Sequence, residues 1–279
     1  MADPLVSTAW LAEHLGDADV QVIDATWFMP GEGRGEDSYA AGHIPGAVFF
    51  DIDAVSDPDT ALPHMLASPE AFAEAAGRLG LGREATIVVY DAQGIFSAPR
   101  AWWNLRVMGF PNVRILNGGL KKWRAEGRPV ETVTPAVAPS RLPSAYHPEL
   151  VRDLAAVKSA LADASAQLVD ARAAARFRGE APEPRAGLRS GHMPGARNLP
   201  WSGLVTAEGT LEDEGELRAA FEAAGVDLSR PIITTCGSGV SAATLALGLA
   251  RLGREDVAVY DGSWTEWGGR PDTEVVKGD

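Results

Sequence analysis

The chain has a single cysteine, Cys236, among its 279 residues. One cysteine excludes an intramolecular disulfide framework and a cysteine-rich metal site. Because nothing indicates an oxidising compartment, we expect a cytoplasmic protein. Positive charge is also scarce: 25 Lys and Arg stand against 38 Asp and Glu, a formal net charge of −13. This balance argues against nucleic acid or an anionic membrane as a binding partner.

Long apolar runs are missing as well. No uninterrupted apolar stretch is long enough to cross a bilayer. The first residues lack the basic leader and apolar run of a signal peptide, so we expect none. The five histidines show no ligand spacing on a helix, and we therefore expect no bound metal.

The stretch around the cysteine predicts a strand, a tight loop and a helix. A short β-branched run, Ile232–Thr235, ends at Cys236, residues 237–241 read Gly-Ser-Gly-Val-Ser, and residues 242–252 are rich in Ala and Leu. The two glycines let the loop curl so that its N–H groups converge on one point. These amides and the helix dipole favour the thiolate, which is the nucleophilic form of a thiol. A lone cysteine is more often a small buried apolar residue, but this loop favours a nucleophile.

The chain contains two copies of one unit. Four segments of the first half match four of the second in the same order: 22–25 with 168–171, 42–47 with 191–196, 87–91 with 232–236, and 117–123 with 261–267. Their nearly constant spacing indicates duplicated domains rather than a solenoid. We expect domains at 1–134 and 149–279, joined by a proline-rich linker at 135–148. Because His43 and His192 both lie in repeated segments, we interpret them as structural turn residues.

Within each half, expected strands alternate with expected helices, beginning with a helix at 6–15 and a strand at Val20–Asp24. The pattern predicts an α/β fold of two tandem domains, each a parallel sheet with helices on both faces. Ligand sites of such sheets lie beyond the carboxyl ends of the strands, where Cys236 falls. Its counterpart in the first half is Asp91, which is not a sulfur nucleophile. One active half and one degenerate half are therefore expected.

These residues resemble the rhodanese superfamily of sulfurtransferases in its tandem-domain form, over essentially the whole chain. The paired Gly-His-x-Pro-Gly-Ala segments, the cysteine loop and the closing Asp-Gly-Ser-Trp at 261–264 carry the resemblance. The Cys-Gly-Ser-Gly-Val-Ser loop is similar to that of 3-mercaptopyruvate sulfurtransferases, which usually end it with Thr; Ser241 keeps the hydroxyl. Thiosulfate-preferring members typically carry basic residues where this chain has Gly237 and Ser238.

The resemblance implies a two-step sulfur transfer through a persulfide on Cys236. Sulfur would come from 3-mercaptopyruvate, pyruvate would leave, and a thiol acceptor such as thioredoxin, or cyanide, would take the outer sulfur. The resemblance implies no cofactor, because the cysteine itself carries the sulfur. The loop residues expected to bind the substrate are Gly237, Gly239, Val240 and Ser241.

Positive charge gathers in one part of this acidic chain, against only Glu180 and Glu183. Its members, between residues 171 and 197, are Arg172, Arg176, Arg178, Arg185, Arg189 and Arg197. A run of charges is ordinarily a solvated loop. The resemblance instead implies that Arg176 and Arg185 bind the carboxylate and keto oxygens of the donor, which suits the planar fork of arginine. Arg178 is alternatively a structural partner of Glu180 or Glu183.

The resemblance also implies a proton-handling group of Ser238, His64 and Asp53. Such a relay suits the chemistry because the donor thiol must lose a proton and the departing enolate must gain one. Plainer interpretations exist for each member. Ser238 could cap the following helix, His64 could be a surface-loop histidine beside Pro63, and Asp51 competes with Asp53 for the third role.

Three other functions compete with this hypothesis. A thiosulfate sulfurtransferase is disfavoured by the neutral loop. A non-enzymatic persulfide carrier requires the arginine segment to be incidental. A cysteine-dependent phosphatase of the same fold needs an arginine to hold phosphate where this chain has Ala242, so it is discounted.

Overall fold

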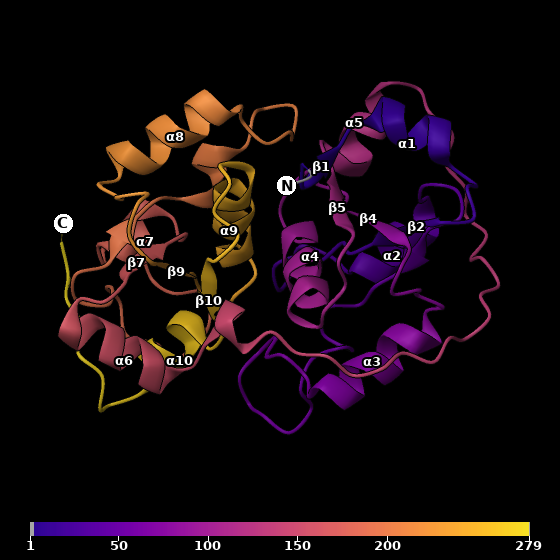
Figure 1. Cartoon of the computed structure of the whole chain (residues 1–279). Coiled ribbons are helices and arrows are strands. Elements are labelled where there is room, and N and C mark those ends of the chain that lie inside the picture. Colours follow the sequence, from indigo (N-terminus) through magenta and orange to yellow (C-terminus); the bar gives the residue numbers. More distant parts are fainter. Residues whose placement is uncertain (1–2, 279) are drawn as a thin grey trace. The chain divides into compact units, whose positions relative to one another are not determined.

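The computed structural model describes residues 3–278 and divides the chain into two compact units (Figure 1). The first unit is built from the first half of the chain together with Val205–Leu211. The second is built from the second half together with Asp59–Met65. These two exchanged segments occupy corresponding places in the sequence repeat. Each unit therefore contains the equivalent short segment of the opposite half.

The first unit contains a five-stranded parallel sheet in the order β1-β5-β4-β2-β3. Its strands are β1 Leu5–Val6, β2 Val20–Asp24, β3 Val48–Phe49, β4 Thr86–Tyr90 and β5 Val113–Leu116. Its helices are α1 Thr8–His14, α2 Gly35–Ala41, α3 Pro69–Arg78, α4 Ala98–Val107 and α5 Gly119–Ala125. Alternate residues of the central strands face opposite sides of the sheet. Val22 and Val88 therefore share a core cluster with Leu11 of α1 and Trp123 of α5.

The second unit repeats this sheet in the order β6-β10-β9-β7-β8, again with parallel pairing. Its strands are β6 Val151–Arg152, β7 Gln167–Asp170, β8 Arg197–Asn198, β9 Ile232–Thr235 and β10 Ala258–Tyr260. Its helices are α6 Leu154–Asp163, α7 Ala174–Phe177, α8 Glu214–Ala223, α9 Ala242–Arg251 and α10 Ser263–Gly269, with 3-10 turns η1 Pro148–Leu150 and η2 Trp201–Leu204. Val157 of α6 and Trp264 and Trp267 of α10 share a core cluster with Ile233 of β9.

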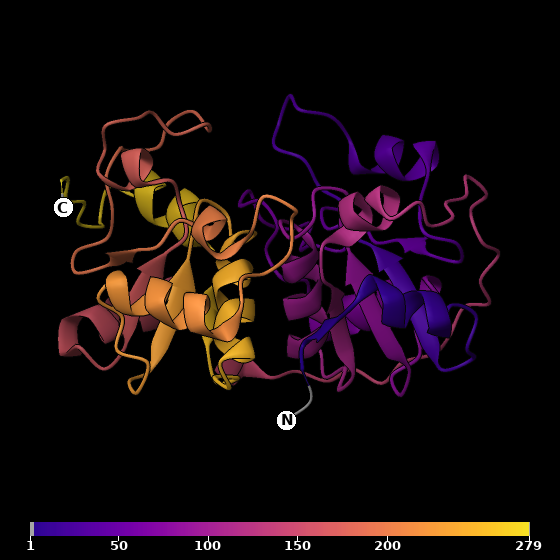
Figure 2. The same ribbon diagram turned by 90° about the horizontal axis from the view of Figure 1, so that it is seen from above.

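Figure 2 shows helices on both sides of the sheet in each unit. The predicted α/β class, with two parallel sheets covered on both faces, is therefore confirmed. One predicted element differs: the helix expected at 6–15 begins at Thr8, because Val6 belongs to strand β1 and pairs with Leu116 of β5. Ser7 caps the helix, its side chain accepting a bond of 3.0 Å from the N–H of Trp10.

The two repeated histidines have the same structural role in each unit. Nδ1 of His43 donates to the carbonyl of Tyr39 at 2.9 Å, and the two rings stack with centroids 3.9 Å apart. Nδ1 of His192 donates to the carbonyl of Phe177 at 2.9 Å, with ring centroids 3.7 Å apart. Both imidazoles are buried. They hold turns, as their presence in both halves predicted.

Candidate active site

Cys236 lies directly after β9, at the carboxyl edge of the second sheet, and only 2% of it is exposed. Its backbone is held from two sides by the turn that follows β10. The N–H of Cys236 donates to Oγ of Ser263 at 3.2 Å, and its carbonyl accepts from the N–H of Trp264 at 2.9 Å. Ser263 Oγ in turn donates to the carbonyl of Tyr260 at 2.8 Å. The backbone of the candidate nucleophile is therefore fixed by the residues that follow β10, the neighbouring strand.

Ser263 is a site residue that sequence reasoning did not single out. It has a positive φ of 49°, a left-handed conformation that is uncommon outside glycine. The corresponding residue of the first unit is Gly119, with a φ of 55°. A signal existed in the repeat, because the Gly-Gly of one half aligns with Gly-Ser of the other, but only the backbone shows that a hydroxyl there reaches the cysteine N–H.

The loop between β9 and α9 is short and mostly buried. Gly239 has a φ of 80°, which provides the sharp turn that the Gly-x-Gly pattern predicted. The carbonyl of Gly237 accepts from both the N–H and the hydroxyl of Thr265, at 2.9 and 2.7 Å. Val240 is 3% exposed, whereas Gly237 and Ser241 are partly open. The loop therefore presents its backbone, rather than apolar side chains, at the strand edge.

Ser238 is not the cap of α9. The residue before the helix is Ser241, whose side chain makes no capping bond. Ser238 is buried, with 6% of the residue exposed. Ser238 is therefore not the N-cap residue of α9, and its part in proton handling stays a prediction.

The first unit shows what a loop of this kind does with an anion. Asp91 follows β4 as Cys236 follows β9, and its buried carboxylate accepts five backbone N–H bonds of 2.8–2.9 Å. The donors are Gln93, Gly94, Phe96, Ser97 and Ala98. The carbonyl of Asp91 accepts from Leu120 N–H at 2.9 Å, which reproduces the bond between Trp264 and Cys236. The loop is an anion-binding nest, here filled by the chain's own carboxylate.

The six arginines of the basic stretch have different surroundings. Arg189 donates to the carbonyls of Trp267, Gly268, Arg270 and Thr273 and so closes the end of α10. Arg178 pairs with Glu180 at 2.8 Å on the surface, one of the two alternatives predicted for it. Arg197 is exposed beside Gly225. Arg172 is buried.

Arg172 forms a buried ion-pair network. It donates to Asp170 at 2.7–3.1 Å and to Glu183 at 2.8 Å, and its guanidinium lies 4.1 Å from the ring centroid of Trp264. Burial opposes the charged form of Arg172, but the carboxylates of Asp170 and Glu183 outweigh it and raise the pKa. These contacts make Arg172 a structural residue.

Arg176 and Arg185, the two arginines predicted to bind the donor, both lie beside other predicted site residues. A Cβ placed on Gly237 would be 3.1 Å from Nη2 of Arg176, so this guanidinium borders the cysteine loop. Nη2 of Arg185 lies 3.3 Å from Nε2 of His64. All four residues belong to the second unit, because His64 is part of the exchanged segment.

His64 is not a surface histidine, since only 5% of it is exposed. It also has a positive φ of 64°, which costs a non-glycine residue about 1–2 kcal/mol and points to a functional or steric constraint. The two candidate aspartates lie in the first unit and differ from each other. Asp51 accepts the N–H groups of Asp53 and Ala54 at 2.9 and 3.2 Å and so caps a turn. Asp53 instead accepts from Nε1 of Trp27 at 3.1 Å.

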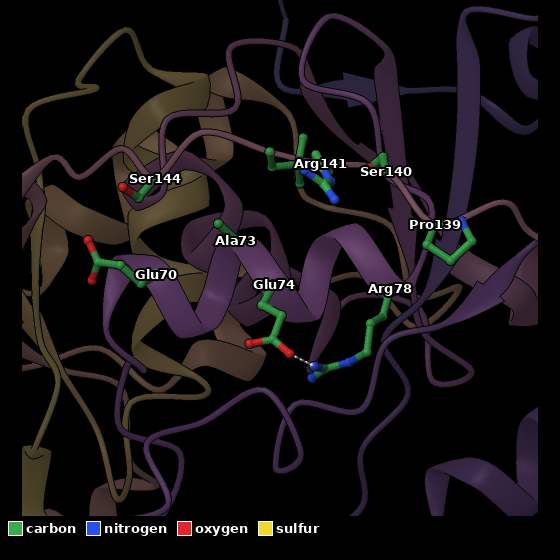
Figure 3. Close-up of a pocket in the computed structure, with 9 residues that line it drawn as sticks. Glu70, Ala73, Glu74, Arg78, Pro139, Ser140, Arg141 and Ser144 are labelled. Carbon is green, nitrogen blue, oxygen red and sulfur yellow. Dashed lines mark hydrogen bonds and ion pairs between the residues drawn. The ribbon is translucent and has the colours of Figure 1, made fainter.

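Two other kinds of feature would bear on function in the described part of the chain, a metal cluster and a membrane-spanning helix. Within residues 3–278 no group of three metal-ligating side chains is placed to hold a metal ion, and no helix is long and apolar enough to cross a membrane. A groove of about 410 Å³ runs between α3 and residues 139–144 of the first unit (Figure 3). Two of its four charged lining residues, Glu74 and Arg78, are exposed and pair with each other at 2.6 Å. It contains none of the predicted site residues.

Comparison with known proteins gives consistent matches. The family model for the rhodanese-like domain matches residues 7–126 and 153–270. The 3-mercaptopyruvate sulfurtransferase of Escherichia coli K12 is 48% identical over 97% of this chain and 96% of its own length. The thiosulfate sulfurtransferase of Bos taurus is 42% identical, covering 98% and 95%. The crystal structure of SseA from Escherichia coli, described as a 3-mercaptopyruvate sulfotransferase, superposes with a TM-score of 0.87 at 45% identity, covering 94% of this chain and 99% of that one.

Proposed function

Because this chain belongs to the rhodanese-like family in both of its halves, we propose that it is a sulfurtransferase that takes sulfur from 3-mercaptopyruvate. The sulfur is held as a persulfide on Cys236 and passed to a thiol acceptor or to cyanide, and pyruvate is released. The observation that carries the proposal is the position of the lone cysteine in a neutral, amide-rich loop bordered by Arg176.

In the first step the Cys236 thiolate attacks the sulfur of the donor. The Sγ–S bond forms and the C–S bond breaks, and its electron pair leaves on carbon as the enolate of pyruvate. The donor thiol gives up one proton and the enolate takes one up. Ser238 and His64, with Asp53 as third member, are proposed to carry that proton. Arg176 and Arg185 hold the carboxylate and keto oxygens and keep the C–S bond aimed at the thiolate.

The loop stabilises the negative sulfur that forms. In the sister loop of the first unit, five N–H groups converge on the carboxylate of Asp91. The loop at 236–241 is one residue shorter and carries no charged side chain, so its amides are the donors available to a persulfide anion. In the second step an acceptor thiolate attacks the outer sulfur, which breaks the S–S bond and restores the Cys236 thiolate.

A neutral loop supports 3-mercaptopyruvate over thiosulfate. Thiosulfate is a dianion and gains from cationic side chains beside the nucleophile, whereas this chain has Gly237 and Ser238 there. Relatives named for either donor match the chain at more than 40% identity, so the choice of donor depends on the loop and on experiment.

The chemistry of the cysteine supports a proposal for the acceptor and for the location. An exposed dithiol such as that of thioredoxin, or a small thiol, removes a persulfide sulfur by thiol exchange. A nucleophile that must return to the thiolate suits a reducing compartment, and we propose the cytoplasm.

Initial rates with 3-mercaptopyruvate and with thiosulfate, measured with one acceptor, test the proposal. We expect a large preference for 3-mercaptopyruvate and complete loss of transfer in Cys236→Ser. A preference for thiosulfate would replace the donor and leave the nucleophile. A persulfide that forms once without turnover would favour a sulfur carrier, and activity that survives in Cys236→Ser would remove the covalent mechanism.

A further inference from the structure

Glu183 bridges two arginines, Arg172 and Arg176, of which Arg176 borders the cysteine loop. Its Oε1 accepts from Nη1 of Arg172 at 2.8 Å, and its Oε2 accepts from Nη2 of Arg176 at 2.5 Å. The Glu183 side chain is 2% exposed and that of Arg172 is 1% exposed, whereas 23% of the Arg176 side chain is open. The bridge therefore has a buried end and an open end, and the open end faces the loop.

The buried end is anchored to the same frame as the nucleophile. Arg172 also donates to Asp170 at the end of β7 and to the carbonyl of Gly191 at 2.9 Å. Its guanidinium stacks on the ring of Trp264, and the N–H of Trp264 binds the carbonyl of Cys236. A displacement of Glu183 relative to Cys236 would thus require a buried ion-pair network to rearrange.

From this geometry we propose that Glu183 is a positioning residue, which holds the guanidinium of Arg176 beside the cysteine loop before the donor arrives. The inference rests on the proposed function, in which Arg176 binds the donor carboxylate. A free arginine side chain loses much rotamer freedom when it binds a ligand, and a fixed carboxylate removes most of that cost in advance. Both oxygens of Glu183 are needed, because each accepts from a different arginine.

Glu183→Gln separates this role from simple charge. A glutamine has one acceptor oxygen and turns an N–H₂ group toward the other guanidinium, so one arginine is released. We expect KM for 3-mercaptopyruvate to rise about tenfold, with a much smaller change in kcat. The matched control is Glu180→Gln, which breaks the exposed pair between Glu180 and Arg178. Its kinetic constants should remain those of the unaltered chain.

A second readout does not depend on turnover. Iodoacetate and iodoacetamide both alkylate a thiolate, but only iodoacetate carries a carboxylate for Arg176 to attract. We expect the ratio of the two alkylation rates at Cys236 to fall several-fold in Glu183→Gln and to stay unchanged in Glu180→Gln. Failure of 3-mercaptopyruvate as a donor would refute the proposed function and leave this ratio as the test of Glu183.

Unfolding of the variant must be distinguished from misplacement of the arginine. Melting temperatures are measured for each variant, and Glu183→Asp, which keeps the charge on a shorter side chain, provides a second test if Glu183→Gln does not fold. A raised KM together with a lower alkylation ratio in a folded variant supports the proposal. An unchanged ratio and KM, with or without a lower melting temperature, would mean that Glu183 is only structural.

Discussion

The carboxylate of Asp91 accepts more backbone hydrogen bonds than a single hydrogen-bond deletion would remove, so its loss should be measurable as a change in stability. Asp91→Ala deletes an acceptor of five backbone N–H bonds and leaves those amides directed at an empty, buried point. A hydrogen bond to a charged group contributes about 1.5–3 kcal/mol, so five independent bonds would give about 7–15 kcal/mol. The five share one carboxylate, and the loop can relax and admit water, so we expect a loss of about 3–5 kcal/mol.

The assay is equilibrium unfolding in urea, followed by tryptophan fluorescence, because Trp102 and Trp103 are buried in α4, the helix that follows this loop. Glu74→Ala is the control: it removes an exposed carboxylate that pairs with Arg78, and should cost less than about 0.5 kcal/mol. Hydrogen exchange of residues 93–98 should accelerate in Asp91→Ala and not in the control.

Formate provides a test that is specific to an anion nest. Formate that occupies the vacated position of Asp91 stabilises the variant by mass action, by about 1.4 kcal/mol at ten times its dissociation constant. Chloride at the same ionic strength should do less, and neither salt should act in this way on the unaltered chain. A loss below about 1 kcal/mol, or equal effects of formate on both proteins, would refute the view that this loop is built to hold an anion.

Two further predictions concern the first unit. Gly94→Ala should destabilise the chain by about 2–3 kcal/mol in the same urea assay, because Gly94 has a φ of 120° and an added Cβ would lie 2.7 Å from the backbone of Gly209. An unchanged stability would mean that the segment at 205–211 moves aside at little cost in free energy. Glu126→Gln should lower the free energy of unfolding by about 1 kcal/mol at pH 7. Hydrogen bonds, first from Arg128, lower the pKa of Glu126 to about 2, and solvent screening reduces the contribution of these contacts to stability. The ionised form is favoured in the fold, so this stability is present above pH 4.5 and is lost as the pH falls toward 2. Urea midpoints of the two proteins should therefore converge on acidification, and a constant difference would contradict the assignment.

The central strands and the duplication were predictable because both leave a local pattern. The β-branched run Ile232–Thr235 is β9 with the expected bounds. The repeat extends to individual bonds: Nε1 of Trp123 donates to the carbonyl of Pro129 at 2.7 Å, and Nε1 of Trp267 donates to that of Glu274 at 2.7 Å. Edge strands leave no such pattern, since two residues are too few for alternation, and Val6 was accordingly assigned to the wrong element.

The exchanged segments had no signal in the sequence either. Nothing local distinguishes Asp59–Met65 from an ordinary loop of the first half, yet it packs with the second unit and brings His64 to Arg185. The partners of such a segment are more than a hundred residues away, and a single sequence does not specify contacts at that range. The resemblance to a family could name His64, but the burial of its ring required the fold.

The arginines show most clearly where sequence reasoning stops. Six positive charges in one stretch looked like a single basic region, but charge counts say nothing of what each guanidinium meets. Arg189 donates to backbone carbonyls. Because every residue has such a carbonyl, no sequence pattern marks these partners. Arg172 donates to the carboxylates of Asp170 and Glu183. Only those whose partners leave part of the side chain open, Arg176 foremost, can serve a substrate. The carboxylate of Glu183 pairs with both kinds of arginine. One of its oxygens binds the buried, structural Arg172, and the other holds Arg176 beside the cysteine loop, where we propose that it binds the donor.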